Sequence, residues 1–113
     1  MRLNKLETPG LILDRGKLVA NIAALHTRLK RLGVNLRPHG KTAKNSDVLR
    51  MALAGQTGGI TVSTLKEAEY YFAHGIVDMV YAVGIAPVKM DRLTALIAKG
   101  AQISIILDSM AQA

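Results

Sequence analysis

The stretch "GGITVSTLKEAEYYFAHGIVDMVYAVG", residues 58–84, holds two short apolar runs on either side of a segment with helical periodicity. Thr64 followed by Glu67 is a capping box, which predicts a helix that begins at this threonine and ends at the next glycine. The runs 58–63 and 78–84 are predicted strands because they are short and apolar. Two strands joined by one helix favour parallel pairing through a right-handed crossover.

The same alternation of strand and helix extends in both directions from this unit. The pattern predicts further strands at 10–14, 34–37 and 102–108. It predicts further helices from Asp14 to Gly33, from an N-cap at Ser46 to Ala54, and from Pro87 to Lys99, with another helix starting in 109–113. Pro38 ends the second strand because proline cannot donate to a ladder. The chain is therefore predicted to be α/β, with about four βα units.

Two architectures suit this alternation, a doubly wound sheet and part of a (β/α)₈ barrel. No G-x-G-x-x-G follows a predicted strand, and "GQTGG" (55–59) precedes one, so the barrel is favoured. A full barrel takes ~250 residues, and four units leave strand edges unpaired. We therefore expect residues 1–113 to be the N-terminal portion of a barrel whose remainder lies outside this chain. The alternative is a small complete four-stranded domain.

Composition narrows the class of protein. Half of the residues are hydrophobic, and there is no cysteine, no signal-peptide pattern and no apolar run near the ~20 residues of a membrane helix. These features predict a soluble, cytoplasmic protein without a membrane partner. The net charge of +7 would suggest nucleic acid. However, most cations fall in predicted helices, and three Tyr, one Phe and no Trp offer few stacking surfaces, so no nucleic-acid partner is expected.

Positive charge is concentrated in "LRPHGKTAKN" (36–45), where a predicted parallel strand ends. Sites of barrels lie at this end of the strands. Lys41 could form a Schiff base with a carbonyl if its pKa were lowered by desolvation or by the neighbouring Arg37, His39 and Lys44. The stretch could equally be a solvated basic loop. A phosphate-binding P-loop is disfavoured because only the final G-K-T of its motif is present.

The motifs R-P-H-x-K-T (37–42) and T-V-S-T-L-x-E-A-E (61–69) resemble those of the D-threonine aldolase and D-serine dehydratase group. These are fold-type III pyridoxal-phosphate enzymes related to the N-terminal domain of alanine racemase. The resemblance covers essentially the whole chain, and within the group the sequence is most similar to D-threo-3-hydroxyaspartate dehydratase-like members. It implies an alanine racemase-type pyridoxal-phosphate barrel. It also implies that the segment 10–14 belongs to a β-domain outside this chain.

The resemblance also implies site residues. Lys41 would hold pyridoxal 5'-phosphate as a Schiff base and take the α-proton of the substrate. Five further residues would surround the cofactor: Arg37, His39, Ser63, Thr64 and Tyr81. Where the commonest motif reads K-T-H-K, this chain has Ala43, so that second histidine is missing. A divalent metal is expected in the full-length enzyme through residues outside this chain, and no metal ligand is assigned within it.

The implied activity is that of a lyase, a dehydratase or aldolase acting on small D-3-hydroxy amino acids such as D-threonine, D-serine or D-threo-3-hydroxyaspartate. The whole protein is expected to be a homo-oligomer, and this chain alone to have little activity. The alternatives are a non-catalytic pyridoxal-phosphate carrier and a basic α/β interaction domain. Outside the motif, His26 is predicted to be an exposed surface residue, and Glu67 is predicted to cap its helix. His74 is predicted to lie in the last turn of its helix, where it interacts favourably with the helix dipole.

Overall fold

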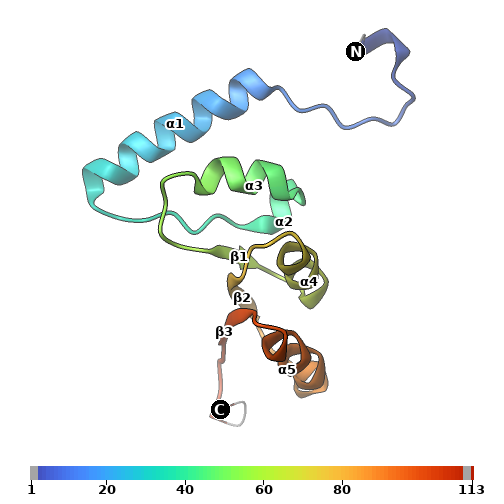
Figure 1. Ribbon diagram of the computed structural model, residues 1–113, viewed down its shortest axis with the longest axis vertical. Coiled ribbons are helices and arrows are strands. Elements are labelled where there is room, and N and C mark those ends of the chain that lie inside the picture. Colours follow the sequence, from blue (N-terminus) through green and yellow to red (C-terminus); the bar gives the residue numbers. More distant parts are fainter. Residues whose placement is uncertain (1–2, 111–112) are drawn as a thin grey trace.

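The computed structural model describes residues 3–110 and 113. Its elements, in chain order, are the 3₁₀ helix η1 (Leu3–Lys5), α1 (Arg15–Leu32), α2 (Gly40–Ala43), α3 (Ser46–Leu53), β1 (Ile60–Val62), α4 (Leu65–Ala73), β2 (Asp78–Gly84), the 3₁₀ helix η2 (Pro87–Lys89), α5 (Met90–Ala98) and β3 (Gln102–Ile106). The strands form one parallel sheet in the order β1-β2-β3, with α4 and α5 beside it (Figure 1). The predicted α/β class is confirmed.

The sheet has one buried face and one open face. The core face carries side chains that are fully buried: Ile60, Val62, Met79 and Tyr81. They belong to one core with the buried residues of α4 and α5, which include Leu65 and Leu93. The open face carries residues that are half-buried or exposed: Thr61, Val80 and Ser104. Because helices cover the outside of a (β/α)₈ barrel, the open face is the one that would line a barrel interior.

The predicted helix ends are largely confirmed. Asp14 caps α1 by accepting a hydrogen bond from the backbone N–H of Lys17 at 3.0 Å, and Gly33 ends α1 with a left-handed φ of 66°. The capping box of α4 also forms, because the Glu67 N–H donates to Thr64 Oγ1 at 3.0 Å. These local signals succeed because each depends on residues only a few positions apart.

The predicted strand at 10–14 is wrong. This segment has no regular structure, and its apolar side chains are exposed, Leu11 fully so. A strand needs a partner for its backbone N–H and C=O groups, and no described part of the chain pairs with this one. A partner strand in a β-domain outside this chain, as the resemblance implies, would account for its apolar composition.

The prediction of a strand at 34–37 is also wrong, because these residues form no continuous hydrogen-bonded ladder with the sheet. The segment is extended, but it joins the sheet only through a parallel bridge between His39 and Thr61, with the Thr61 N–H donating to Pro38 O at 2.8 Å. The proline has no N–H to continue the ladder, and the Leu36 N–H donates to the Gln56 side chain instead. The segment nevertheless leads directly into α2, which begins at Gly40.

Smaller differences occur at element ends. Asn45, not Ser46, caps α3, because its side-chain oxygen accepts from two backbone N–H groups of the first turn. The four-residue helix α2 was not predicted, since it is too short to show periodicity. The predicted helix at 87–99 begins as η2, and the strand predicted at 102–108 ends at Ile106. The helix predicted to start in 109–113 lies partly outside the described residues.

Candidate active site

Lys41 lies in the first turn of α2, immediately after the extended segment has passed β1. This position is at the carboxyl end of the parallel strands. The side chain is exposed, and no described residue bonds its Nζ. His39 caps α2, since its Nδ1 accepts from the backbone N–H of Lys41 at 3.2 Å. The lysine backbone is thus fixed while its amine is left available.

His39 connects Lys41 to the end of β1. Its Nε2 lies 3.0 Å from Ser63 Oγ. Because Nδ1 accepts from a backbone N–H, we assign the ring proton to Nε2, which then donates to the serine hydroxyl. Burial lowers the pKa of His39, the charge of Lys41 lowers it further, and Glu67 opposes both effects. The ring is therefore neutral at pH 7.

Ser63 is in turn held by the capping box of α4. Its backbone N–H donates to Glu67 Oε2 at 2.8 Å. Thr64, the next residue, is close in sequence, but its hydroxyl accepts the capping bond from the Glu67 N–H. The structure therefore brings together Lys41, His39 and Ser63 as one hydrogen-bonded cluster, and it shows that Glu67 supports that cluster besides capping its helix.

Tyr71 reaches the same cluster and was not singled out from the sequence. Its side chain is fully buried, and its hydroxyl donates to Gly40 O at 2.8 Å. A Cβ on Gly40 would lie 2.4 Å from Tyr71 Cε2, so the tyrosine ring occupies the space that a side chain would need. The available signal was its spacing of four residues from Glu67, which places both on one face of α4.

Arg37 does not lie with Lys41. Its guanidinium makes a bidentate ion pair with Asp78, with both N–O distances 2.9 Å, at the start of β2. This hydrogen-bonded pair raises the pKa of Arg37 and lowers that of Asp78. Gly59 lies against the aspartate, and a Cβ there would come 1.9 Å from Asp78 O. The charged pair therefore sits at the amino end of the strands, opposite the lysine.

Tyr81 is also placed apart from the lysine cluster. Its side chain belongs to the core face and is fully buried. Its hydroxyl accepts a hydrogen bond from Lys89 Nζ at 2.9 Å. His39 and Ser63 belong to the open face of the sheet instead. His39 pairs with Thr61 of that face, and Ser63 follows Thr61 by two residues. The structure does not bring Tyr81 together with Lys41.

The prediction that His26 is an exposed surface residue is wrong. The side chain is half-buried, and its Nε2 lies 2.8 Å from Ala52 O. The bond connects α1 to α3, which explains why the ring turns inward. His74 lies at the end of α4, as predicted, where it forms the C-cap, and its side chain is exposed.

Nearly the whole chain is similar to a known protein family. Residues 13–113 match the family described as alanine racemase, N-terminal domain. The chain belongs to this family. The resemblance drawn from the two motifs, and the barrel type that it implied, are thereby confirmed.

Three relatives of this alanine racemase-type chain are informative. D-threo-3-hydroxyaspartate dehydratase of Delftia sp. (strain HT23) is 43% identical over 108 residues, which are 96% of this chain and 28% of that protein. Its solved structure superposes with a TM-score of 0.91 at 42% identity, over 96% of this chain and 28% of that chain. D-threonine aldolase of Arthrobacter sp. is 33% identical over 95% of this chain and 28% of that protein. D-serine dehydratase of Dictyostelium discoideum is 33% identical over 78% and 23%.

The chain thus spans less than a third of the length of these relatives. By name, the relatives are dehydratases and an aldolase of D-amino acids, so the family includes lyases. The alanine racemase-type chain contains the hydrogen-bonded cluster of Lys41, His39 and Ser63.

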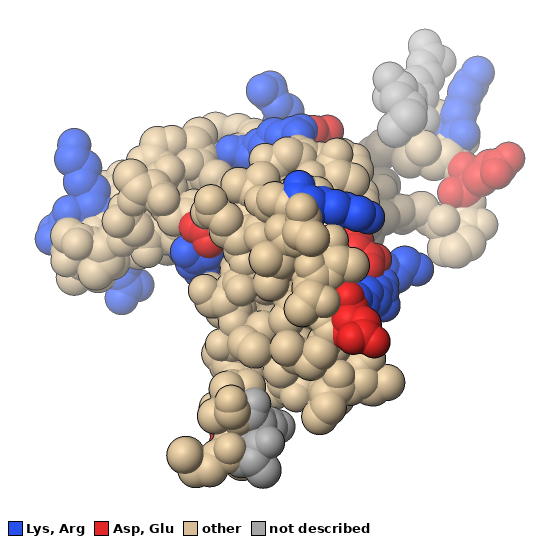
Figure 2. All heavy atoms as spheres, turned by 60° about the horizontal axis from the view of Figure 1, so that its bottom comes forward, with Lys and Arg blue, Asp and Glu red and all other residues tan. Residues whose placement is uncertain are grey.

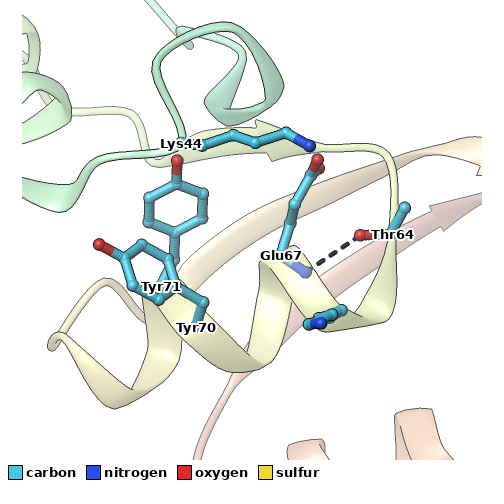
Figure 3. A pocket seen from close by; sticks show the side chains of 6 residues that line it. Lys44, Thr64, Glu67, Tyr70 and Tyr71 are labelled. Atoms are coloured by element: carbon cyan, nitrogen blue, oxygen red, sulfur yellow. Dashed lines mark hydrogen bonds between the residues drawn. The ribbon is translucent and has the colours of Figure 1, made fainter. Parts of the chain in front are cut away.

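A hollow of about 500 Å³ opens next to this cluster, between α2 and the first turns of α4 (Figure 3). Its lining comes from Lys44, Thr64, Lys66, Glu67, Tyr70 and Tyr71. In Figure 3 the Lys44 amine extends toward the Glu67 carboxylate. Lys41 is not among the residues that line this hollow.

The remaining surface of the alanine racemase-type chain shows no second centre of charge on the face drawn in Figure 2. There the Lys and Arg side chains are scattered over several places and do not form one patch. Within residues 3–110 and 113, no three His, Cys, Asp or Glu side chains gather as a metal site. No helix in the described part of the chain is long and apolar enough to cross a membrane.

Proposed function

We propose that this chain is the lysine-bearing part of a pyridoxal-phosphate-dependent lyase, a dehydratase or aldolase, acting on D-3-hydroxy amino acids. The observation that carries the proposal is the position of Lys41, which stands at the carboxyl end of the strands with its backbone fixed by His39 and its amine unbonded by any described residue. The relatives named for D-3-hydroxy amino acid reactions support the substrate class.

The residues present fit a cofactor that carries an aldehyde. An exposed primary amine at the mouth of the strands can condense with a carbonyl, and the neutral His39 and the Ser63 hydroxyl provide polar groups without adding charge beside it. Lys41, His39 and Ser63 would therefore hold the cofactor's reactive end. When bound, the cofactor supplies an electron sink for the electrons left on the substrate Cα.

The chain's own contribution to the chemistry centres on Lys41 Nζ. We propose that this amine binds the cofactor covalently and, once released by the substrate, takes the α-proton as general base. Arg37, Thr64 and Tyr81 remain proposed neighbours of the cofactor, although the polar group of each is bonded elsewhere in this structure. A β-hydroxyl is a poor leaving group, and a divalent cation held by residues outside this chain would assist its departure.

Sodium borohydride reduction with pyridoxal phosphate, followed by peptide mass mapping, tests the proposal in the whole protein. We expect one pyridoxyl adduct, on Lys41. Two variants that keep the positive charge form the matched pair. Lys41→Arg should lose the adduct and lower turnover of D-threonine or D-serine by at least about a hundredfold, because it removes the general base. Lys44→Arg, three residues away at the C-cap of α2, should keep the adduct.

Each outcome assigns a different function. An adduct on Lys41 together with turnover of a D-3-hydroxy amino acid supports the lyase. An adduct without turnover of any such substrate would favour the non-catalytic carrier. Labelling spread over many lysines would contradict both and leave a basic α/β interaction domain. We further propose that the whole protein is a cytoplasmic homo-oligomer that needs neither nucleic acid nor membrane, and light scattering gives its mass in solution.

A further inference from the structure

The peptide group between Gly40 and Lys41 is held by side chains at both of its polar atoms. Its N–H donates to His39 Nδ1 at 3.2 Å, and its carbonyl oxygen accepts from the Tyr71 hydroxyl at 2.8 Å. The same oxygen also accepts the Lys44 N–H at 2.9 Å, which is the helical bond of α2. The backbone that immediately precedes the lysine side chain is thus fixed from two directions.

The burial of Tyr71 and the absence of a side chain on Gly40 allow this contact. The side chain is fully buried, and its ring lies where a Cβ of Gly40 would come within 2.4 Å of Cε2. Only glycine therefore allows the hydroxyl to reach this carbonyl without a shift of α2. Burial raises the pKa of Tyr71, and the neighbouring Tyr70 and Glu67 raise it further, so the hydroxyl remains a donor at neutral pH.

The other side of the peptide is held from the same helix. Glu67, one turn before Tyr71 on α4, accepts the Ser63 N–H at 2.8 Å. Ser63 Oγ in turn meets the His39 ring that accepts the Lys41 N–H. Helix α4 therefore determines the orientation of the Gly40–Lys41 peptide through two separate routes.

We propose that Tyr71 is a positioning residue for the reaction of Lys41. By donating to the Gly40 carbonyl it fixes the peptide from which the lysine side chain extends, and so it sets the direction in which Nζ meets the cofactor and the substrate. Tyr71 itself touches neither. The inference rests on the proposed function of Lys41 and adds to it a residue that acts through the backbone.

The test uses Tyr71→Phe in the whole protein, with Tyr70→Phe as the matched control. Both variants remove one hydroxyl from α4, but the Tyr70 hydroxyl only accepts the Ser46 N–H at 3.4 Å. We expect Tyr71→Phe to slow covalent attachment of pyridoxal phosphate to Lys41 about tenfold and to shift the absorbance maximum of the lysine-bound cofactor. Per mole of bound cofactor, kcat should fall by about the same factor while KM changes less than about twofold.

These readouts separate positioning from folding, because a loss of folded protein lowers the amount of bound cofactor but not kcat per bound cofactor. Gly40→Ala gives an independent second variant, since the added Cβ displaces the peptide from the intact tyrosine. It should slow attachment to a similar extent. Wild-type attachment rate and spectrum in Tyr71→Phe, or in Gly40→Ala if the first variant does not fold, would overturn the positioning role alone. Absence of any adduct at Lys41 in the unmodified protein would overturn the proposed function as well.

Discussion

The two ends of the sheet both carry polar contacts between neighbouring segments, but the contacts differ in kind. At the amino end, Arg37 and Asp78 form a bidentate pair of full charges at 2.9 Å. At the carboxyl end, His39 and Ser63 share a neutral hydrogen bond at 3.0 Å, and the Lys41 amine has no described partner. A cation that is paired contributes to the fold, whereas one that is left unpaired beside neutral groups is available for chemistry.

Among the substitutions considered, Gly59→Ala, at the amino end of the strands, should destabilise the fold most. The new Cβ would overlap the backbone of Asp78, with only 1.9 Å to its carbonyl oxygen, so β1 and β2 would have to separate. We expect the free energy of unfolding of the whole protein to fall by about 3 kcal/mol, measured by urea denaturation.

Gly75→Ala is the control for this change. Gly75 has a left-handed φ of 81°, but an added methyl group would meet no other atom within 4 Å, so the substitution costs only backbone strain of about 1 kcal/mol. Equal destabilisation by the two substitutions would show that the overlap at Gly59 is relieved without harm to the sheet.

His39→Ala should weaken the carboxyl end by a smaller amount. It removes the N-cap of α2, for which losses of about 0.5–2 kcal/mol are usual, and we expect cofactor attachment to Lys41 to slow about tenfold. His74→Ala, which alters an exposed histidine at the far end of α4, should leave the attachment rate unchanged. Comparable slowing in both variants would contradict a specific role for His39.

The pH dependence follows from the same ring. The pKa of His39 is lowered in the folded protein. As pH falls below about 6.5, His39 therefore becomes protonated in the unfolded chain before it does so in the folded protein. Stability therefore decreases as pH falls through that value, and it stops decreasing below the folded pKa. Protonation of Nδ1 also removes the acceptor for the Lys41 N–H. In His39→Ala this part of the pH profile, followed by thermal unfolding, should be absent.

Asp78→Asn should have the smallest effect. The Asp78 side chain is 42% exposed, so solvent screens the pair and we expect a loss of at most about 1 kcal/mol, with cofactor attachment unchanged. Because the pKa of Asp78 is lowered, its contribution is present above the unfolded value of about 3.9 and is lost as pH falls through the folded pKa. Asp47→Asn, in a more exposed pair with Arg50, should show no measurable change. A slower attachment rate in Asp78→Asn would mean that the two ends are coupled.

The sequence predicted most of what depends on near neighbours. The capping box at Thr64 and the glycine end of α1 depend on residues within one or two turns, and both formed as predicted. The strand at 10–14 failed because a strand also depends on a partner, which no described residue supplies. Within the site, the motif places His39 two residues before Lys41, and in the structure the Lys41 N–H donates to His39 Nδ1.

Two contacts, that of Arg37 with Asp78 and that of Tyr71 with Gly40, could not be predicted from the sequence, and for the same physical reason. Arg37 is only two residues from His39, but a side chain that long can turn along the strands to Asp78, which is 41 positions away in sequence. Tyr71 reaches Gly40 across 31 positions. Such contacts depend on register between segments, and a single sequence does not contain that information.

Helix α1 has no buried residue, although it is the longest helix described. Its attachment consists of half-buried apolar side chains and the bond from His26 to Ala52 O. Detaching it exposes little new apolar surface, so its local opening costs far less free energy than global unfolding. Amide hydrogens in α1 would consequently exchange with solvent by a partial opening, while the sheet, α4 and α5 stay closed.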